Sequence, residues 1–181
     1  MKKYILSIAF SLTVCSSVLA QAPVTPAPDQ FALLKSSDPR EAANKKVVFD
    51  FLRVVLDAGH LEDVDKYVGE NYVEHNPLIP SGRDAMVKFF KGAPRAEIRP
   101  TIKGSVVAIT AEGELVTVVF VWSESDPCVP GRTYTATQFD LFRVANGKIV
   151  EHWDDTRLGV PLPGGTRTCL TPAAAAGAPR N

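Results

Sequence analysis

Residues 138–155 decide the fold, and they read Gln-Phe-Asp-Leu-Phe-Arg-Val-Ala-Asn-Gly-Lys-Ile-Val-Glu-His-Trp-Asp-Asp. This pattern predicts a β-hairpin, because Asn146-Gly147 tolerates the positive φ angles that a tight hairpin turn requires. β-Branched and aromatic residues, which favour strands, are frequent on both sides of the turn. The hairpin therefore predicts an antiparallel sheet in the second half of the chain.

The length of the turn decides which side chains share a face of this hairpin, because side chains alternate along each strand. A two-residue Asn-Gly turn pairs Asp140 with Trp153, whereas a three-residue Ala-Asn-Gly turn pairs Asp140 with His152. We prefer the three-residue turn, because it collects the apolar and the ionisable residues on one face. An aspartate and a histidine in an apolar sheet face indicate a lined pocket. That face would comprise Asp140, Phe142, Val144, Val150, His152 and Asp154.

The chain before the hairpin predicts helices first and strands afterwards. Asp38 has the features of an N-cap with proline following it, and apolar residues at spacings of three and four extend this helix to about Ala58. This order of elements predicts an α+β fold. Shorter helices are expected at 61–67 and 81–92, with an irregular segment at 70–80 between them. Strands are expected at 99–111, 114–123, 134–144 and 148–156, of which 114–123 would be buried on both faces.

The first 20 residues have the features of a secretory signal peptide, which is removed from the mature protein. Two lysines are followed by a short apolar stretch at residues 4–14 and a small-residue cleavage site that ends at Ala20. A lipid-attachment motif ending at Cys15 fits less well, because Val14 is too large for the residue before a lipidated cysteine. The apolar stretch is too short to span a membrane. We therefore expect a periplasmic or secreted protein without stable membrane insertion of the mature chain.

Composition divides the remaining chain into three parts. Residues 21–37 begin with a Pro/Ala-rich linker, residues 38–157 form one domain with a core, and residues 158–181 are a Gly/Pro/Ala-rich extension. Cys128 and Cys169 remain after cleavage. An oxidising compartment favours a disulfide between them, and two free thiols are the alternative.

Charge and motifs exclude several classes of function. The chain has 20 Lys and Arg and 20 Asp and Glu, and these are interspersed without a basic patch, so a nucleic-acid partner is not expected. The sequence contains no glycine-rich phosphate loop and no nucleophile elbow. A cluster of His75, His152, Asp140 and Asp154 would offer metal ligands, but these residues lack the spacing typical of zinc sites. We expect neither a metal nor a cofactor.

Two segments resemble the signatures of a known family. Tyr-Val-Glu-His-Asn-Pro at 72–77, followed by Ser-Gly-Arg at 81–83, resembles the first signature of the SnoaL-like proteins, and residues 140–154 resemble the last. These proteins belong to the superfamily of nuclear-transport-factor-2-like α+β cones. The resemblance covers roughly residues 41–155. It implies N-terminal helices packed on a strongly curved antiparallel sheet, a pocket between them, and a homodimer formed through the open sheet face.

The resemblance also implies site residues. In the polyketide cyclases of this family an aspartate is the acid/base of a cofactor-free intramolecular aldol closure, and Asp140 matches it by position. His75 and His152 lie in the matching motifs and would orient the substrate or donate protons. Some relatives carry a further histidine where this chain has Val119, and this difference, together with export, weakens the polyketide interpretation. The other residues expected to line the pocket are Phe142, Trp122, Tyr72 and Asp154.

Two functions remain open on this basis. The protein is either a cofactor-free acid/base catalyst of aldol cyclisation, isomerisation or related proton transfer on a small hydrophobic carbonyl compound, or a non-catalytic module that binds a small apolar ligand. In the second case Asp140 and His152 only anchor the ligand. The alternative for Asp140 by itself is a structural carboxylate bonded to His152, Arg143 or the backbone, and the alternative for His75 is a cap on the turn at Asn76.

Overall fold

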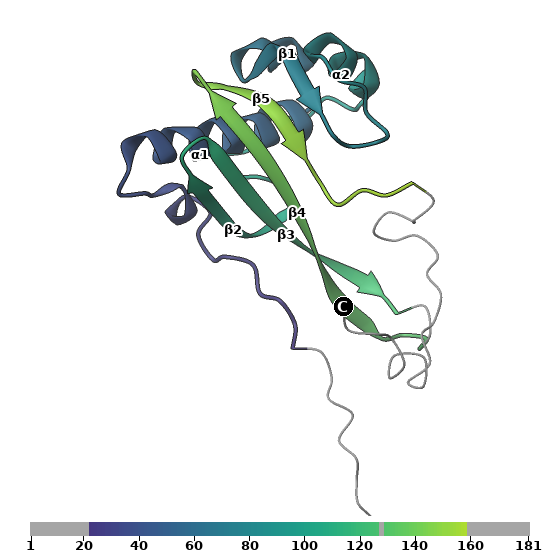
Figure 1. Cartoon of the computed structure of the whole chain (residues 1–181). Helices are drawn as coiled ribbons and strands as arrows, with labels where there is room; N and C mark the ends of the chain where they lie inside the picture. The colour runs from purple at the N-terminus through teal and green to yellow at the C-terminus, as the bar shows by residue number, and fades with distance from the viewer. Residues whose placement is uncertain (1–21, 127–128, 159–181) are drawn as a thin grey trace, which may run out of the picture.

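Figure 1 shows the computed structural model of the chain, which describes residues 22–126 and 129–158. The helices are the 3₁₀ turns η1 (Ala32–Leu34) and η3 (Leu61–Lys66), the π-helical η2 (Leu52–Leu56), α1 (Pro39–Phe51) and α2 (Arg83–Phe90). The strands are β1 (Val68–Glu74), β2 (Ser105–Glu112), β3 (Leu115–Ser125), β4 (Thr133–Ala145) and β5 (Lys148–Trp153). Among the described residues, no helix combines the length and the apolar character that crossing a membrane requires.

The predictions about export and cysteines concern residues outside this range. The signal peptide, Cys128 and Cys169 all lie outside the described residues, as does most of the C-terminal extension. Cleavage after Ala20 and the disulfide therefore stay predictions.

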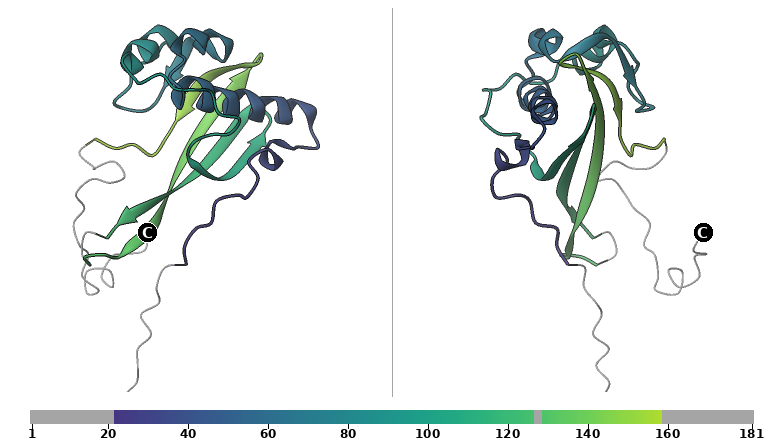
Figure 2. Two further views of the ribbon diagram at one scale, coloured as in Figure 1. Left: turned by 180° about the vertical axis from the view of Figure 1, so that it is seen from behind. Right: turned by 60° about the vertical axis from the view of Figure 1, so that its left-hand side comes forward.

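The strands form one sheet in the order β1-β5-β4-β3-β2. β2, β3, β4 and β5 pair with their neighbours in antiparallel fashion, whereas β1 runs parallel to β5. The sheet is strongly twisted and curved, and α1 crosses one of its faces (Figures 1 and 2). β1 and α2 lie together at one end, above β5. The fold is the predicted α+β cone of helices on a curved, mostly antiparallel sheet.

β1 corrects the first part of the segment at 70–80, which was expected to be irregular, whereas residues 75–80 are irregular as expected. Val68 pairs with Ile149 and Glu74 with His152, and the backbone N–H of His75 donates to the carbonyl oxygen of His152 at 3.0 Å. The local sequence does not favour a strand, because it contains glycine and asparagine, and the pairing with β5 fixes it instead. This strand matters for function, because it brings the first motif beside the last.

α1 begins where the sequence predicts. Asp38 Oδ1 accepts a hydrogen bond from the backbone N–H of Arg40 at 2.7 Å, and Pro39 is the first helical residue. Beyond Phe51 the helix widens into the π-helical η2, in place of a regular α-helix to Ala58. Together α1 and η2 supply the apolar side chains that face the sheet.

The core lies between these helices and the concave face of the sheet. Residues of β3 alternate between buried and half-buried from Leu115 to Phe120, so burial of this strand on both faces is wrong. The outer face of the sheet is left half-buried or exposed. The most completely buried core side chains include Val48, Phe49, Val55, Val116, Val118, Val144 and Ile149.

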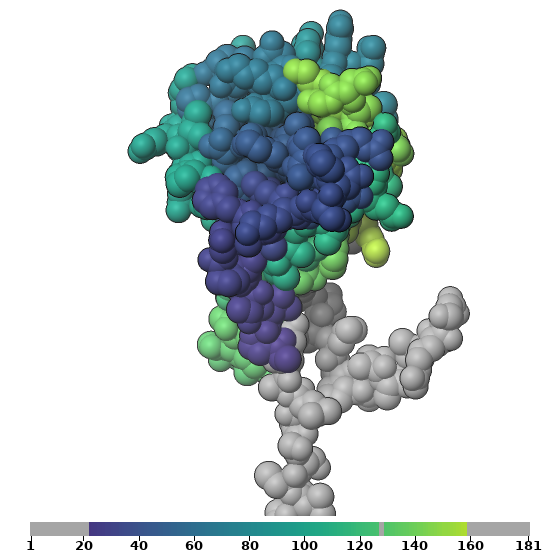
Figure 3. Space-filling view, turned by 90° about the vertical axis from the view of Figure 1, so that its left-hand side faces the viewer, coloured from purple at the N-terminus to yellow at the C-terminus, as the bar shows by residue number. Residues whose placement is uncertain are grey.

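The segment before α1, expected as a linker, docks on the domain. Ala27 N–H donates to the carbonyl oxygen of Val106 at 2.8 Å, and the side chain of Gln30 bonds to backbone atoms of Ile102 and Gly104. Figure 3 shows this segment running from α1 along one side of the molecule. It shields part of β2, the edge strand, from pairing with another chain.

Candidate functional site

The β4–β5 hairpin turns through two residues. Asn146 (φ 51°) and Gly147 (φ 71°) both adopt left-handed conformations, and Ala145 pairs with Lys148 across the turn. The preferred prediction of a three-residue turn is therefore wrong, and the alternative of a two-residue turn is confirmed.

One extra residue in β5 changes the pairing beyond this turn. Val144 pairs with Ile149 but Arg143 pairs with Glu151, so Val150 forms a β-bulge. Next along the strand, Phe142 pairs with His152. Without the bulge, Phe142 would face Glu151, and His152 would point to the outer side of the sheet. The bulge thus restores His152 to the face that was predicted for it.

The predicted face is largely right although its pairing is wrong. Neither proposed partner lies opposite Asp140, because Trp153 pairs with Leu141 and His152 with Phe142. Asp140, Phe142, Val144 and His152 are all buried, and Ile149 takes the inward position predicted for Val150.

A cavity of about 190 Å³ opens between the helices and this face. It has an apolar side and a polar side. The apolar side is formed by Phe51, Leu56, Ile79, Met86, Phe90 and Phe142. The polar side, called the polar wall below, is formed by Tyr72, Glu74, Gln138, Asp140, His152 and Asp154.

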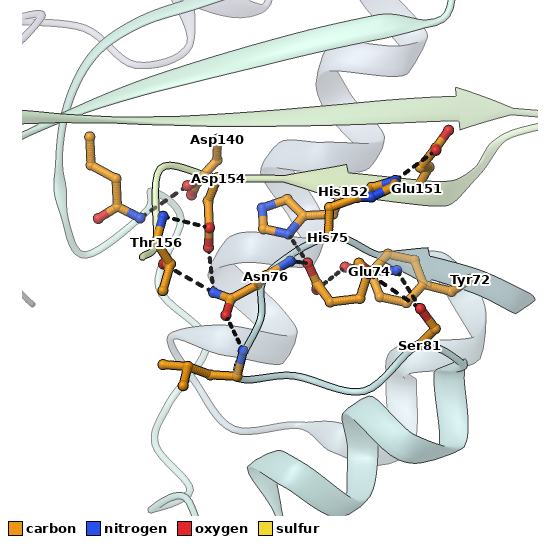
Figure 4. A network of polar contacts seen from close by, with 12 residues as sticks. Tyr72, Glu74, His75, Asn76, Ser81, Asp140, Glu151, His152, Asp154 and Thr156 are labelled. Carbon is orange, nitrogen blue, oxygen red and sulfur yellow. Dashed lines mark hydrogen bonds and ion pairs between the residues drawn. The ribbon is translucent and has the colours of Figure 1, made fainter. Parts of the chain in front are cut away.

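Glu74 orients His152 in the polar wall. Its carboxylate accepts hydrogen bonds from His152 Nδ1 at 2.8 Å, from the Tyr72 hydroxyl at 2.6 Å and from the backbone N–H of Asn76 at 2.9 Å. The Glu74 side chain is only 2% exposed. Figure 4 shows the second ring nitrogen, Nε2, turned toward Asp140 and Asp154. Nδ1 is thereby engaged, and Nε2 is left for a ligand.

The charges of this pair are stabilised by each other. Burial works against the charge of Glu74, but its hydrogen bonds to His152, Tyr72 and Asn76 lower its pKa overall. Burial also opposes the His152 cation, yet the hydrogen bond to Glu74 and the nearby carboxylates raise the pKa of His152. For the Tyr72 hydroxyl, burial and Glu74 both raise the pKa. The arrangement favours an ionised Glu74 beside a protonated His152.

Asp140 has a different environment. It is 8% exposed, and its Oδ1 accepts one hydrogen bond from Gln138 Nε2 at 3.0 Å. Burial raises its pKa to about 6, against the lowering effects of Gln138 and His152. Among the described residues, no hydrogen bond engages its second oxygen, Oδ2. This carboxylate is able to accept a proton near neutral pH.

Asp154 completes the wall on the side of the first motif. Its Oδ2 accepts a hydrogen bond from Asn76 Nδ2 at 2.6 Å, and its Oδ1 accepts one from the backbone N–H of Thr156 at 2.9 Å. Asn76 also donates to the Thr156 hydroxyl at 3.1 Å. These neutral donors fix the carboxylate beside the cavity.

Three of these residues have the composition of a cation site. Asp140, His152 and Asp154 each place one potential ligand atom within 4.8 Å of the other two. Carboxylate and imidazole groups bind divalent metals, but a histidine must be deprotonated to do so. The raised pKa of His152 opposes this, and the expected absence of a metal stays a prediction.

The structure separates His75 from the other proposed catalytic residues. Its side chain is 43% exposed, and Nε2 contacts Glu151 Oε1 at 2.9 Å. Its ring stacks on Trp153 with centroids 4.9 Å apart. Glu151 and Trp153 flank His152 on β5 but do not line the cavity. His75 is therefore placed outside the pocket, contrary to the role expected for it.

Trp122 also lies away from the cavity, so its expected pocket-lining position is wrong. It is 39% exposed and stacks on Phe120, with centroids 6.2 Å apart. β3 and β4 extend past the end of β2, whose pairing with β3 stops at Val121. Trp122 belongs to this projecting part. Tyr72, Phe142 and Asp154 do line the cavity as expected.

Sequence reasoning missed Glu74 and Gln138 as site residues. Glu74 lies within the first motif, and the alternation Tyr72-Val73-Glu74 would have placed it beside Tyr72 had the segment been read as a strand. Gln138 lies two residues before Asp140 on β4, which places both side chains on the same face. Strand alternation was the available signal for both residues.

Comparisons with known proteins point to one family. Residues 48–152 match the family model of the SnoaL-like domain, a range that includes β1 and ends at His152. No curated protein matches the chain. Among solved structures, similarity is found to a protein described as a SnoaL-like polyketide cyclase from Jannaschia sp. CCS1, with 20% identity, a TM-score of 0.47, and coverage of 67% of this chain and 91% of that one.

Two other solved structures resemble the chain to a similar degree. One is described as a polyketide cyclase from Xanthomonas campestris pv. campestris, with 20% identity, a TM-score of 0.45, and coverage of 67% of this chain and 94% of that one. The other is an LEH-like epoxide hydrolase from M. tuberculosis, with 18% identity, a TM-score of 0.44, and coverage of 62% and 76%.

Proposed function

This chain belongs to the SnoaL-like domain family, and we propose that it is a cofactor-free acid–base catalyst that moves protons on a small, mainly apolar carbonyl compound. The family and the cavity fit a small-molecule catalytic or binding module. One observation supports catalysis over binding alone. Asp140 Oδ2 and His152 Nε2, both without a hydrogen-bond partner among the described residues, face the same cavity.

The two groups have complementary roles in proton transfer. The Asp140 carboxylate takes a proton from the carbon next to the carbonyl, and the electrons of that C–H bond form the C=C bond of an enol. The carbonyl oxygen takes a proton from His152 Nε2. In an isomerisation of a compound with a further C=C bond next to the enol, Asp140 returns its proton to the far end of the conjugated system, the double bond shifts, and the enol oxygen gives its proton back to His152. In an aldol closure, the enol carbon attacks a second carbonyl carbon of the same molecule and the C=O π bond there breaks. The oxygen of that carbonyl takes the proton from Asp140, and the enol oxygen returns its proton to His152.

The protonation states that this step needs coexist in one pH range. Asp140 must be ionised, which requires a pH above its pKa of about 6. His152 must be protonated, and its raised pKa extends the protonated form above the ordinary range of histidine. The rate should therefore depend on pH as a bell, with its acid limb near 6 and its basic limb set by His152.

Hydrogen–deuterium exchange tests the proposal without knowledge of the natural substrate. Cyclohexanone in D₂O exchanges the hydrogens next to its carbonyl when a base and an acid act on it, and NMR measures the rate. We expect the protein to accelerate this exchange with the bell-shaped profile. Asp140→Asn should lower the rate by about 10²–10⁴-fold, the usual contribution of a general base. His152→Gln should remove the basic limb.

Glu151→Gln is the matched control, because Glu151 is a β5 carboxylate next to His152 but does not line the cavity. Its rate should stay close to that of the unmodified protein. Exchange that survives Asp140→Asn unchanged would rule out Asp140 as the base. Binding of the ketone without any exchange would support the alternative, a non-catalytic ligand-binding module.

We also propose that the protein is exported and forms a homodimer. Export rests on the signal-peptide features of residues 1–20, and an N-terminus other than Gln21 in the mature protein would contradict the proposed cleavage site. The homodimer rests on the family resemblance and on the exposed apolar side chain of Phe139 on the outer face of the sheet.

A further inference from the structure

The polar wall carries more negative than positive charge. Glu74 and His152 form one ion pair, with Nδ1 and Oε1 2.8 Å apart. Asp140 and Asp154 then remain, and their hydrogen-bond donors are the neutral groups of Gln138, Asn76 and Thr156. Within the described part of the chain, no lysine or arginine lines the cavity. The site therefore has an excess of acceptors without a balancing cation.

One of these carboxylates is aimed into the cavity with an unused oxygen. Asp140 is 8% exposed, and its only hydrogen bond among the described residues goes through Oδ1. A buried carboxylate oxygen without a donor is costly, and a ligand that brings a donor or a positive charge relieves that cost. Asp154 lies beside it, with a potential ligand atom within 4.8 Å.

The other side of the cavity suits the body of such a ligand. Phe51, Phe90 and Phe142 present aromatic rings, and aromatic faces attract cations as well as apolar groups. The volume of about 190 Å³ equals that of about six water molecules in the liquid. A buried ligand is thus about the size of a single six-membered ring with one or two small substituents.

We infer that the pocket selects a compact carbonyl compound that also carries an ammonium group, attracted by the combined charge of Asp140 and Asp154 and by the aromatic rings, and that it rejects carboxylates. The assignment of a carbonyl group to the ligand rests on the proposed function. The assignment of an ammonium group rests on the charge balance and the shape of the cavity. The attraction is electrostatic, and it is stronger at a buried carboxylate such as Asp140 than at an exposed one.

Three ring ketones of the same frame test the inference: 4-aminocyclohexanone, 4-hydroxycyclohexanone and 4-oxocyclohexanecarboxylate. Their dissociation constants are measured by NMR titration of the full mature protein at pH 7. We expect the amino ketone to bind at least about tenfold more tightly than the hydroxy ketone, and the carboxylate to bind most weakly. Equal binding of the three, or tightest binding of the carboxylate, would overturn the inference.

Two variants separate a local effect from the general charge of the protein. Asp154→Asn should reduce the preference for the amino ketone over the hydroxy ketone by about tenfold. The dissociation constant of the hydroxy ketone should stay unchanged, which also shows that the variant is correctly folded. Asp155→Asn removes a charge from the neighbouring residue, which is exposed and does not line the cavity, and should keep the full preference. An equal loss of preference in both variants would contradict a specific site at Asp154.

The exchange assay distinguishes failure of this inference from failure of the proposed function. A charge preference in binding without exchange that depends on Asp140 would sustain the ammonium site and refute the acid–base mechanism. Exchange that depends on Asp140 without any charge preference would do the reverse.

Discussion

At the scale of single residues, Asp140 shows the conflict between stability and chemistry most directly. Burial raises its pKa from 3.8 to about 6, so the folded protein binds its proton more tightly than the unfolded chain does. By linkage, this difference costs roughly 3 kcal/mol of folding free energy when the carboxylate is fully ionised. The cost is absent below pH 3.8, grows as the pH rises, and is complete above about 6.

Asp140→Asn should therefore stabilise the protein at pH 8 while it lowers the rate of the proposed proton transfer. Asparagine keeps the oxygen that accepts from Gln138 and removes the buried charge. We expect the free energy of unfolding to rise by up to roughly 3 kcal/mol at pH 8 and to change little near pH 4. Urea unfolding at these two pH values measures the difference.

The exposed residue Asp155 provides the control for this experiment. Asp155→Asn removes a charge from a side chain near the surface and should alter stability by less than about 0.5 kcal/mol at either pH. The change in the free energy of unfolding caused by Asp140→Asn is compared between pH 8 and pH 4. If the substitution is less favourable at pH 8 than at pH 4, the native structure stabilises the ionised aspartate.

The candidate site was predictable from the sequence where strand alternation applies. Asp140 and His152 were expected on one face and do share it, but only because the unpredicted bulge at Val150 offsets the wrongly predicted three-residue turn. His75 and Glu74 show the limit, because they are adjacent in the first motif and one of them must point away from the pocket. Only the pairing of β1 with β5 decides that Glu74 points inward and His75 outward.

At the scale of elements, two glycines with nearly the same φ angle allow two costs of an added side chain to be compared: strain in the backbone and a clash with neighbouring atoms. Gly59 has φ of 70° and Gly147 has φ of 71°. A Cβ on Gly147 would meet nothing within 4 Å, whereas one on Gly59 would lie 2.7 Å from the carbonyl oxygen of Pro94. A side chain added at either position would be strained by the left-handed backbone, and one added at Gly59 would also clash with Pro94.

Gly147→Ala should lower the free energy of unfolding by about 1 kcal/mol, the usual cost of a left-handed alanine. Gly59→Ala should cost about 1–3 kcal/mol more, because rigid backbone must move. Urea unfolding of both variants checks the order. Asn146→Gly, in the same turn as Gly147, is the control and should change stability only slightly, because glycine adopts the observed φ of 51° without strain. Equal losses at Gly59 and Gly147 would mean that the chain near Pro94 yields to the added methyl group.

The hairpin itself shows what element-level prediction can and cannot give. The Asn-Gly turn was expected from composition and is present, since only these residue types adopt two successive left-handed conformations readily. The bulge was not expected. Its extra residue is Val150, a β-branched side chain like those of ordinary strands, so nothing in the local sequence distinguishes it.

At the scale of the whole molecule, the outer face of the sheet is the expected dimer interface. Phe139 is 52% exposed there and pairs with Val119 across β3 and β4. Exposed apolar side chains on a broad sheet face are typical of surfaces that another chain covers. Phe139→Asp should therefore convert a dimer into a monomer, as measured by light scattering during size-exclusion chromatography.

Phe89→Asp is the matched control for the assembly. Phe89 is 48% exposed but belongs to α2 and not to a strand of the sheet. Its replacement should leave the mass in solution unchanged. A monomeric mass for the unmodified protein would refute the homodimer.

The overall fold was predictable because its main signals are local. Helical periodicity precedes strand patterns along the chain, and that order gave the α+β class with helices on one side of a sheet. The missing strand, β1, depends on a partner in β5 that is far along the sequence. Long-range pairing of this kind leaves little trace in the segment that it organises.

The bulge at Val150 also affects how relatives of this protein are to be aligned. A relative with the same turn but without the bulge lacks the extra residue, so an alignment without a gap would match its inward side chain to Glu151 instead of His152. The equivalent imidazole is found by counting back from the end of β5, and not by counting forward from the turn. In such a hairpin, a one-residue insertion or deletion moves a catalytic group from one side of the sheet to the other, which no substitution can do.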